Sequence, residues 1–413
     1  MTSQNETPFF TVILPTLGKV DQWAEAASSV LNQTFTDFEL VAVDSGPASI
    51  SRPVIEQLND KRIIYVNTEG GNPRLNWDTG YRHASGKYLI WLDDDNYLLP
   101  HALLTLATII KEKEFPDIVT AEHMHYRGLQ HYISSYLNQL VVLQPLFTGQ
   151  LTKIDPKDIV RRLMGWPQQT KVRARFHMTE TAVKKEIADS LIEKIGEINF
   201  ETTSTHALRV GVLALSKDVY VADTPVALVG QIGHALSYTW PRIDSPVLKE
   251  VKYNLSLSPF SALTYANYRL ENMLRTKKSL GGTIDIEANM PVFTTTYRRE
   301  LLAFEQSWTN WFKNWKGLTR YLQEQTAKEF VPLKKSQWKF LVYGFCVQLL
   351  RSLGLYKLLQ KALSKQRVSD KGGLAIPVQS YGVVGMKSCA DTLPQIVEKE
   401  LHVPYQEFIS VKS

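Results

Sequence analysis

The chain has 413 residues, 44% of them hydrophobic, which is enough for one large domain and a smaller one. Its net charge of +6 permits anionic partners, but no feature calls for a nucleic acid. Two cysteines, Cys346 and Cys389, exclude a disulfide framework and fit a reducing compartment. Neither a signal peptide nor about 20 consecutive apolar residues is visible, so we expect a cytoplasmic protein without a spanning helix.

The first 111 residues alternate between short apolar runs and helical segments. The runs typical of buried strands are 9–14, 38–43, 62–66 and 87–92, and the segments expected to be helices are 21–31, 53–59, 75–84 and 100–111. This order predicts a doubly wound, mostly parallel sheet. In such sheets ligands bind beyond the carboxyl ends of the strands.

Polar clusters follow three of these strands where they end: Pro15-Thr16, Asp44-Ser45-Gly46 and Asp93-Asp94-Asp95. Carboxylates crowded at the end of a buried strand repel each other unless a divalent cation lies between them. Because alternate residues of extended backbone point the same way, Asp93 and Asp95 are expected to face one site and Asp94 to face away. A cation held by one or two carboxylates usually completes its shell with phosphates, which indicates a nucleotide-diphosphate substrate. For the triplet alone, a solvated turn before the next helix is the structural alternative.

Neither a Gly-x-Gly-x-x-Gly after the first strand nor a P-loop occurs in the sequence. Instead, six segments follow one another: Val12–Thr16, Ser29–Leu40, Val43–Gly46, Asn76–Gly80, Ala84–Tyr88 and Asp93–Asp95. Their order and spacing resemble the GT-A fold of family 2 glycosyltransferases over roughly the first 100 residues. The resemblance implies a GT-A (Rossmann-like) doubly wound mixed sheet, an inverting sugar transfer from a nucleotide-diphosphate sugar to a hydroxyl, and Mg²⁺ or Mn²⁺ as cofactor. Polysaccharide biosynthesis is the implied setting.

The same resemblance assigns donor-binding roles to Pro15, Thr16, Asp44, Arg74, Asp93 and Asp94, and metal-ligand roles to Asp93, Asp95 and His234. Arg74 is included because a guanidinium suits phosphate geometry, and an ordinary surface arginine is the alternative. His234 lies in a glycine-containing loop, and neutral imidazole is a reasonable ligand. A loop histidine without a ligand role is the alternative there. Many family members have two acids where this chain has Asp44-Ser45, which weakens inference about the nucleotide base.

The family usually has an acidic residue about 20 residues before a strand ending in Asp-x-Pro. Here that strand is 219–225, and the position expected for the acidic residue holds Thr205-His206 instead of a carboxylate. An imidazole or a carboxylate can act as the general base, so His206 and Glu201 are the candidates and Glu180 a more distant one. A structural histidine in a helix is the alternative for His206.

Two histidines, His123 and His125, alternate as on a strand within residues 122–126. They could form a metal pair, but no further ligand stands at suitable spacing. We therefore interpret this segment as an acceptor pocket or a surface strand.

The expected boundary lies at residue 244, with a donor half (1–115) and an acceptor half (116–244) before it and a helical region (245–413) after it. Trp308, Trp311 and Trp315 fall on one helix face. Residues 337–366 form a basic amphipathic pattern, which fits either an ordinary packed helix or peripheral contact with an anionic membrane. A lipid-linked acceptor would suit the latter.

Two alternatives to the transferase remain open. A nucleotidyltransferase would use the same carboxylates and metal, although Pro15–Lys19 is a poor version of its glycine-rich basic loop. A catalytically impaired protein that binds nucleotide sugars or glycans would explain the missing acid near Thr205.

Overall fold

The computed structural model describes residues 7–16, 20–68, 75–128, 138–173, 175–197, 205–230, 256–260, 264–303, 308–326, 342, 345–355 and 373–412. Within these ranges, no helix combines the length and the apolar character that crossing a membrane requires. The chain divides into two compact units. The first comprises Met1–Ala235, Thr276–Glu287 and Gly373–Ser413, and the second comprises Leu236–Arg275 and Ala288–Gly372.

The first unit is built on a mixed sheet with the strand order β11-β7-β6-β9-β4-β1-β2-β3, and β10 pairs with β5, β6 and β8 beside this path. Strands β4, β1, β2 and β3 are parallel, whereas β9, β7 and β11 pair antiparallel with their neighbours. The strands are β1 (Phe10–Thr16), β2 (Phe38–Asp44), β3 (Ile63–Asn67), β4 (Tyr88–Trp91), β5 (Asn96–Leu98), β6 (Ile118–Arg127), β7 (Gln139–Leu143), β8 (Leu151–Ile154), β9 (Thr181–Lys184), β10 (Val219–Gly230) and β11 (Gly373–Pro377). The predicted doubly wound mixed sheet is thereby confirmed.

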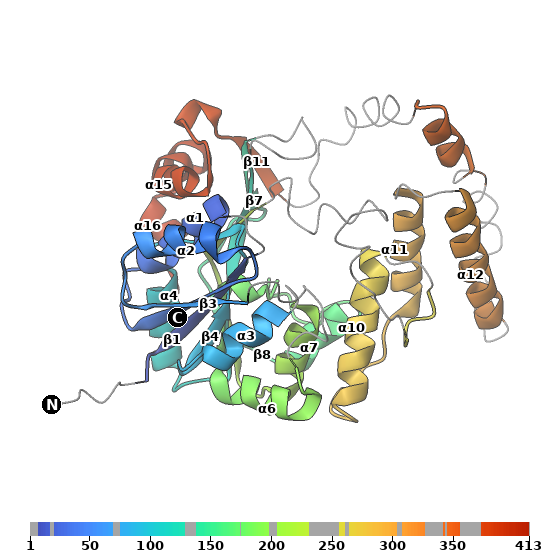
Figure 1. The fold of residues 1–413 in the computed structure, drawn as a ribbon, viewed down its shortest axis with the longest axis horizontal. Helices are drawn as coiled ribbons and strands as arrows, with labels where there is room; N and C mark the ends of the chain where they lie inside the picture. Colours follow the sequence, from blue (N-terminus) through green and yellow to red (C-terminus); the bar gives the residue numbers. More distant parts are fainter. Residues whose placement is uncertain are drawn as a thin grey trace. The chain divides into compact units, whose positions relative to one another are not determined.

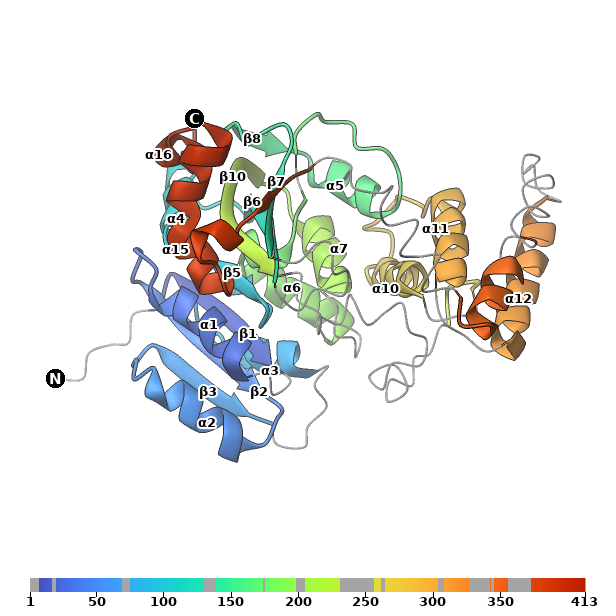
Figure 2. The ribbon, with the colours of Figure 1, turned by 90° about the horizontal axis from the view of Figure 1, so that it is seen from above.

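Helices cover both faces of this sheet. Figures 1 and 2 show α1, α2, α4 and α15 on one face and α3, α6 and α7 on the other. The helices are α1 (Val20–Leu31), α2 (Ala48–Gln57), α3 (Asn76–His83), α4 (Ala102–Glu112), α5 (Pro156–Leu163), α6 (Lys185–Ile195), α7 (His206–Leu215), α15 (Met386–Ile396) and α16 (Tyr405–Phe408), with the short 3-10 helices η3 (Met178–Glu180) and η5 (Gln379–Tyr381) and the π-helical segment η6 (Val397–Leu401). Every side chain of β1 except Pro15 is buried, as a central strand covered on both faces requires.

The predicted elements of the first 111 residues are present, and all but one have boundaries within two residues of expectation. The exception is α2, which begins at Ala48 instead of residue 53 and contains Pro53. A proline inside a helix removes one intrahelical hydrogen bond, so the sequence alone favours a later start.

The last forty residues differ from the predicted helical region. Strand β11 pairs antiparallel with β7, and residues from Gly373 onward belong to the first unit. Apolar side chains of this segment, including Ile376, Cys389 and Leu393, pack in one core with Tyr97 and Met124. The sequence did not predict this strand, because an edge strand supplied from far along the chain has no local signal. The boundary expected at residue 244 lies outside the described residues and stays a prediction.

The second unit is helical where it is described. It contains most of α10 (Tyr265–Ser279), together with α11 (Met290–Ala303) and α12 (Trp308–Thr326). Phe260 stacks on Tyr297, with ring centroids 4.4 Å apart. Trp311 and Trp315 of α12 are buried and stack on each other, which confirms the predicted helical spacing.

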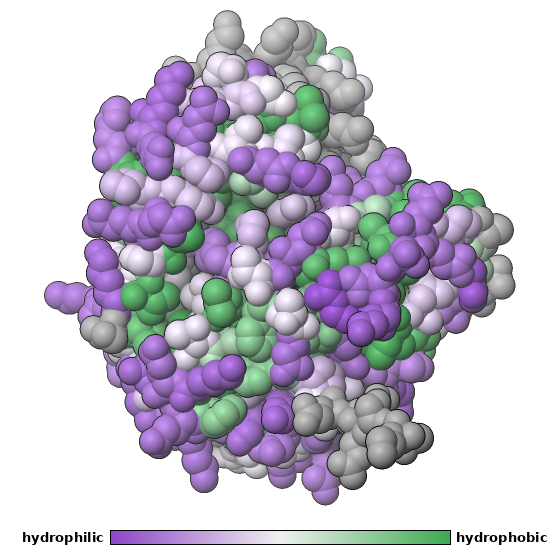
Figure 3. Space-filling view, turned by 90° about the vertical axis from the view of Figure 1, so that its left-hand side faces the viewer, coloured by the Kyte–Doolittle hydropathy of each residue, from purple (hydrophilic) through white to green (hydrophobic). Residues whose placement is uncertain are grey.

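Hydrophilic side chains predominate on the face that Figure 3 presents, with hydrophobic ones in smaller groups between them. In the first unit the exposed large apolar residues include Leu104, Phe115 and Val384. Scattered apolar residues of this kind are normal on a protein surface and call for no partner.

Candidate functional site

The carboxyl ends of β1, β2 and β4 meet at one edge of the sheet. We call the polar residues there the strand-end rim: Thr16, Asp44, Asp93, Asp94 and Asp95. Asp44 is fully buried and accepts hydrogen bonds from the Gly46 amide (2.7 Å), Asn67 Nδ2 (3.0 Å) and Tyr65 Oη (3.3 Å). Its carboxylate therefore fixes the chain after β2, and its predicted contact with a nucleotide stays a prediction.

Asn76, the buried first residue of α3, forms hydrogen bonds with the ends of neighbouring strands. Its Nδ2 donates to the Thr16 carbonyl (3.0 Å) and to Ser45 Oγ (3.2 Å), and its Oδ1 accepts from Thr68 Oγ1 (3.3 Å). One amide thus joins the ends of three parallel strands. Close packing of α3 on the sheet depends on Gly80, where an added Cβ would lie 2.3 Å from Ile13 Cγ2.

The aspartate triplet does not have the predicted alternating orientation. Strand β4 ends at Trp91, and Asp94 and Asp95 lie in a turn. Because the backbone is not extended, the two-residue alternation does not apply. Asp94 Oδ2 accepts a hydrogen bond from Thr16 Oγ1 (3.0 Å), so Asp94 faces the end of β1 instead of pointing away from the rim.

Asn96 connects the triplet to its surroundings. Its Nδ2 lies 3.3 Å from Asp93 Oδ2 and 2.7 Å from Thr179 Oγ1, and its Oδ1 accepts from the Gly230 amide (3.1 Å). An added Cβ at Gly230 would lie only 2.0 Å from the Asp95 carbonyl oxygen. The end of β10 therefore approaches the triplet so closely that only glycine fits there.

Several predicted site residues lie outside the described residues: Arg74, Glu201 and His234. Pro15 is described and lies within β1, in register with Val43 of β2. Among the residues that the structure describes, no group of three or more His, Cys, Asp or Glu side chains is arranged to hold a metal ion. The ligand roles of Asp93, Asp95 and His234 remain predictions.

His206 is the buried first residue of α7, which packs against α5 and α6. One turn further on, Arg209 Nη2 donates to the Arg175 carbonyl (2.8 Å). The first turn of α7 therefore lies near the segment that precedes η3. The role of His206 as a base stays a prediction.

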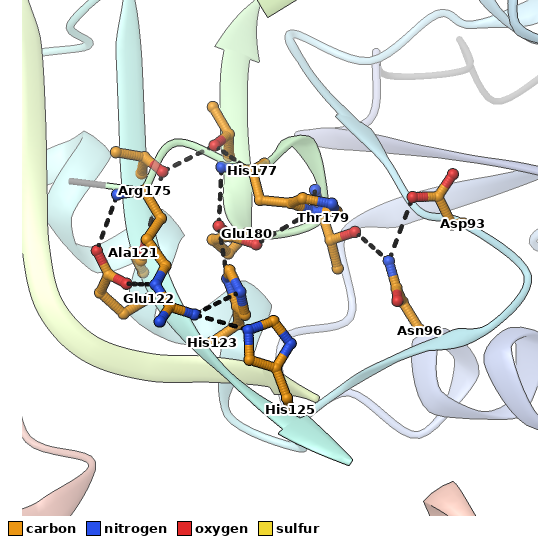
Figure 4. Close-up of polar contacts among 12 residues, drawn as sticks. Asp93, Asn96, Ala121, Glu122, His123, His125, Arg175, His177, Thr179 and Glu180 are labelled. Carbon is orange, nitrogen blue, oxygen red and sulfur yellow. Dashed lines mark hydrogen bonds and ion pairs between the residues drawn. The ribbon is translucent and has the colours of Figure 1, made fainter. Parts of the chain in front are cut away.

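A second group of polar residues lies beside the rim. We call it the imidazole cluster: Glu122, His123, His125, Arg175, His177 and Glu180 (Figure 4). Glu180 is fully buried, and its Oε1 accepts from the His177 backbone amide (2.9 Å) and from His123 Nδ1 (3.0 Å). Its Oε2 lies 3.6 Å from His177 Nδ1. This carboxylate is the point at which strand β6 and the turn η3 join.

The guanidinium of Arg175 fixes the tautomers of two histidines. Its Nη1 donates to His123 Nε2 (3.1 Å) and to His125 Nε2 (2.8 Å). An arginine has no acceptor, so both Nε2 atoms must carry lone pairs. His123 is therefore a neutral imidazole that accepts from Arg175 and donates its Nδ1 proton to Glu180.

The two buried carboxyl groups of the cluster titrate in opposite directions. Burial, reinforced by the negative charge of Glu180, raises the pKa of Glu122 to about 8. Burial also opposes ionisation of Glu180, but its contacts with His123 and His177 outweigh this and lower the pKa of Glu180. Glu122 is thus protonated and Glu180 ionised at neutral pH. Pairs of carboxyl groups whose environments separate their pKa values are common at sites of acid–base chemistry.

The sequence predicted only part of this cluster. The alternation of His123 and His125 indicated a strand, and both lie in β6. Glu180 was a distant candidate for the base. Arg175 and His177 were not singled out. The histidine partners of Arg175 lie some fifty positions away, so no local pattern marks it, and His177 belongs to no motif that the sequence analysis recognised.

The fold and the rim define an α/β protein with a carboxylate-lined site at the ends of its parallel strands. Residues 11–159 match the family described as glycosyl transferase family 2. The resemblance read from the sequence is confirmed, and the nucleotidyltransferase alternative does not correspond to the family found.

Curated relatives match about a quarter of the chain. GalNAc(5)-diNAcBac-PP-undecaprenol beta-1,3-glucosyltransferase of Campylobacter jejuni is 34% identical over 103 residues, which is 24% of this chain and 33% of that protein. Glycosyltransferase GlyA of Streptococcus pneumoniae is 27% identical over 118 residues, which is 28% of this chain and 17% of that protein. The chain thus spans at most about a third of these relatives.

Solved structures also align with the chain. TarS 1–349 of S. aureus in complex with UDP-GlcNAc is 12% identical and has a TM-score of 0.42, covering 89% of this chain and 96% of TarS 1–349. The mannosyltransferase PcManGT of Pyrobaculum calidifontis, in complex with GDP-Man and Mn²⁺, is 14% identical with a TM-score of 0.40, covering 89% of each chain.

Proposed function

We propose that the protein is an inverting glycosyltransferase that moves a sugar from a nucleotide-diphosphate donor to a hydroxyl acceptor. The observation that carries this proposal is the strand-end rim within the segment that matches family 2. There Thr16 donates to Asp94, and Asn96 bridges Asp93 to Thr179 of η3. The rim lies where ligands bind in parallel α/β sheets. We assign donor binding to it.

A divalent cation fits the side chains at this rim. Asp93 and Asp95 supply hard carboxylate oxygens, and Mg²⁺ is typically bound by one or two carboxylates and by substrate phosphates instead of an all-protein cage. A cation at these residues would stabilise the negative charge of the departing diphosphate. Asn96 holds Asp93 in place by a 3.3 Å hydrogen bond.

Calorimetry with UDP, GDP, CDP and dTDP, each with and without Mn²⁺, tests the donor site. We expect one nucleotide to bind in a metal-dependent manner and Asp95→Ala to abolish that binding. Asp391→Ala is the matched control, because Asp391 is an exposed carboxylate of α15 paired with Lys387. Failure of the folded protein to bind any of the four would overturn the proposal.

We further propose that the acceptor is lipid-linked and that the second unit contacts an anionic membrane. The Campylobacter relative carries an undecaprenol diphosphate in the name of its acceptor. In this chain residues 330–369 hold eight basic and no acidic residues: Lys334, Lys335, Lys339, Arg351, Lys357, Lys361, Lys365 and Arg367. Within this stretch Val342, Phe345, Leu349 and Leu353 recur at helical spacing and are exposed. Basic, apolar helical faces of this kind bind anionic bilayers.

Co-sedimentation with phosphatidylglycerol-containing vesicles and with pure phosphatidylcholine vesicles tests the membrane contact. We expect binding to the anionic vesicles, lost in the double variant Phe345→Glu, Leu349→Glu. Leu104→Glu serves as the control, because Leu104 of α4 is 46% exposed, as is Phe345. Equal sedimentation of all three proteins would contradict the membrane contact and leave the donor site untouched.

A further inference from the structure

Strand β6 extends past the end of β4, beside the aspartate triplet. The two strands run in the same direction, because both pair antiparallel with β9, and Val183 of β9 pairs with Leu89 of β4 and with Ile118 of β6. Leu89 and Ile118 therefore lie at one level of the sheet. From that level β4 ends at Trp91, whereas β6 continues to Arg127. The second half of β6, which carries two histidines of the imidazole cluster, lies where α/β sheets bind their ligands.

His125 and Asn96 flank the same residue of β10. Val229 pairs with Asn96 of β5 on one side and with His125 of β6 on the other. Because paired residues direct their side chains to the same face of a sheet, His125 and Asn96 face the same way. Two spacings between strands separate their Cα atoms by about 10 Å. Asn96 lies 3.3 Å from Asp93, so the cluster lies beside the proposed diphosphate site and apart from it.

The hydrogen bonds of His125 and His177 decide which of their ring nitrogens carry hydrogen. His125 accepts from Arg175 at Nε2 (2.8 Å), so its hydrogen is on Nδ1. That nitrogen is buried and has no hydrogen-bond partner among the residues that the structure describes. His177 accepts from the Thr179 amide at Nδ1 (3.4 Å), so its hydrogen is on Nε2, and its side chain is 29% exposed. Both imidazoles therefore offer an N–H donor.

Arginine side chains converge on the same segment. Arg175 directs Nη1 at two histidines of β6 (Figure 4). Its own carbonyl accepts from Arg162 Nη2 (2.9 Å) and from Arg209 Nη2 (2.8 Å). Three guanidinium groups thus meet at one residue, and the site is rich in positive charge.

The buried acids of the cluster leave this charge largely uncompensated. Burial raises the pKa of Glu122 to about 8, so at neutral pH its carboxyl group, 4.0 Å from Arg175 Nε, is uncharged. Glu180 is ionised, but it accepts from His123 Nδ1, and the ring of His123 separates it from Arg175. The positive charge of Arg175 therefore remains to attract an anion.

We propose that Arg175, His125 and His177 bind an anionic group of the acceptor, a phosphate or a carboxylate, through their N–H groups. This inference rests on the proposed function and deepens it, because it names the class of acceptor. An oxyanion combines negative charge with several acceptor oxygens, which suits imidazole N–H groups beside a guanidinium. It also supplies the acceptor that the buried Nδ1 of His125 lacks among the described protein groups.

Four small probes distinguish the anion from the rest of an acceptor. Glycerol 1-phosphate and glucuronate carry the charge, and glycerol and glucose are their neutral counterparts. Their binding to the full chain is measured by ligand-observed NMR, with and without Mg²⁺ and the nucleotide identified by calorimetry. We expect an anionic probe to bind, the neutral probes not to bind, and the nucleotide not to displace the anionic probe. Binding of glycerol 1-phosphate indicates a phosphorylated acceptor, and binding of glucuronate an acidic sugar.

Two variants remove the proposed donors. His125→Phe and Arg175→Gln should each weaken binding of the anionic probe about tenfold or more, because each removes a hydrogen bond to a charged group. Metal-dependent nucleotide binding should be unchanged in both. His83→Gln and Arg52→Gln are the matched controls, because His83 contacts its own helix α3 and Arg52 forms an exposed ion pair within α2. If Arg175→Gln does not fold, His125→Phe is the deciding variant.

The outcomes separate this inference from the proposed function. If the wild-type protein binds no nucleotide, the proposed function fails and the inference with it. If nucleotide binds but neither anionic probe does, or the neutral probes bind equally well, the inference alone is overturned. Displacement of the anionic probe by the nucleotide overturns it too, because the probe would then occupy the diphosphate site. So does an unchanged probe affinity in folded His125→Phe.

Discussion

The strand-end rim and the segment that carries the imidazole cluster are bridged by Asn96, which contacts Asp93 and Thr179. The two regions differ in how exposed their carboxyl groups are. In the rim, Asp93, Asp94 and Asp95 are partly exposed on a turn, where a ligand can meet them. In the cluster, Glu122 and Glu180 are fully buried, and one oxygen of each accepts hydrogen bonds from protein groups. The aspartate triplet is therefore accessible to a ligand, whereas the buried charge of Glu180 holds β6 against the segment at η3, much as the buried Asp44 holds the chain after β2.

The largest expected difference between the two regions is the loss of stability when one carboxylate is removed from each. We expect Glu180→Ala to lower the free energy of unfolding by about 3–5 kcal/mol, because it leaves buried donors without their acceptor. Asp95→Ala should lower it by less than about 1 kcal/mol, since the triplet lies in a partly exposed turn. Denaturant unfolding of both variants measures the difference. Equal losses would mean that the rim is as structural as the cluster.

The close approach of β10 to the triplet gives a second, smaller effect. The added methyl of Gly230→Ala would displace the Asp95 carbonyl, and we expect it to cost about 1–3 kcal/mol of stability. The same displacement should weaken nucleotide binding, because Asp95 moves with its carbonyl. Thermal unfolding and calorimetry on one preparation measure both. An unchanged affinity in this variant would separate the end of β10 from the binding site.

The protonated state of Glu122 predicts how stability depends on pH. Its folded pKa of about 8 lies above the usual value of 4.5. The stability that this group contributes is therefore full below pH 4.5 and is lost as the pH rises toward 8. Glu122→Gln cannot ionise and should keep its stability up to pH 8.5, where the wild type loses about 4–5 kcal/mol relative to pH 4.5 and below. Unfolding curves at pH 5 and pH 8.5 check this, and parallel losses in both proteins would contradict it.

The smallest expected effect concerns the hydrogen bond from Thr16 to Asp94. Thr16→Val keeps the volume of the side chain and removes the hydroxyl, so we expect a loss of about 1 kcal/mol. A loss of nucleotide affinity greater than this would show that the bond orients Asp94 toward the ligand. Calorimetry and denaturant unfolding on the same variant distinguish the two contributions.

The sequence predicted the parallel strands and the rim because the signals for both are local. A short apolar run followed by Asp or Thr marks a buried strand and its carboxyl end. Right-handed connections then bring the ends of β1, β2 and β4 together. Even so, the predicted orientation of Asp94 was wrong. Strand β4 ends at Trp91, and side chains in the turn that follows do not alternate as they do on a strand.

The sequence by itself determined the resemblance to family 2 glycosyltransferases, the parallel strands of the first 111 residues and the position of the carboxylate rim. Only the tertiary structure shows that β11 forms the edge of the sheet beside β7. It also shows that Gly230 lies against the Asp95 carbonyl and that Glu180 contacts both His123 and His177. These features depend on contacts between residues far apart in the chain, whose identities are set by shape and by hydrogen-bond satisfaction in the folded interior. A buried carboxylate such as Glu180 is tolerated only where the fold supplies its donors, and no local pattern records where those donors come from.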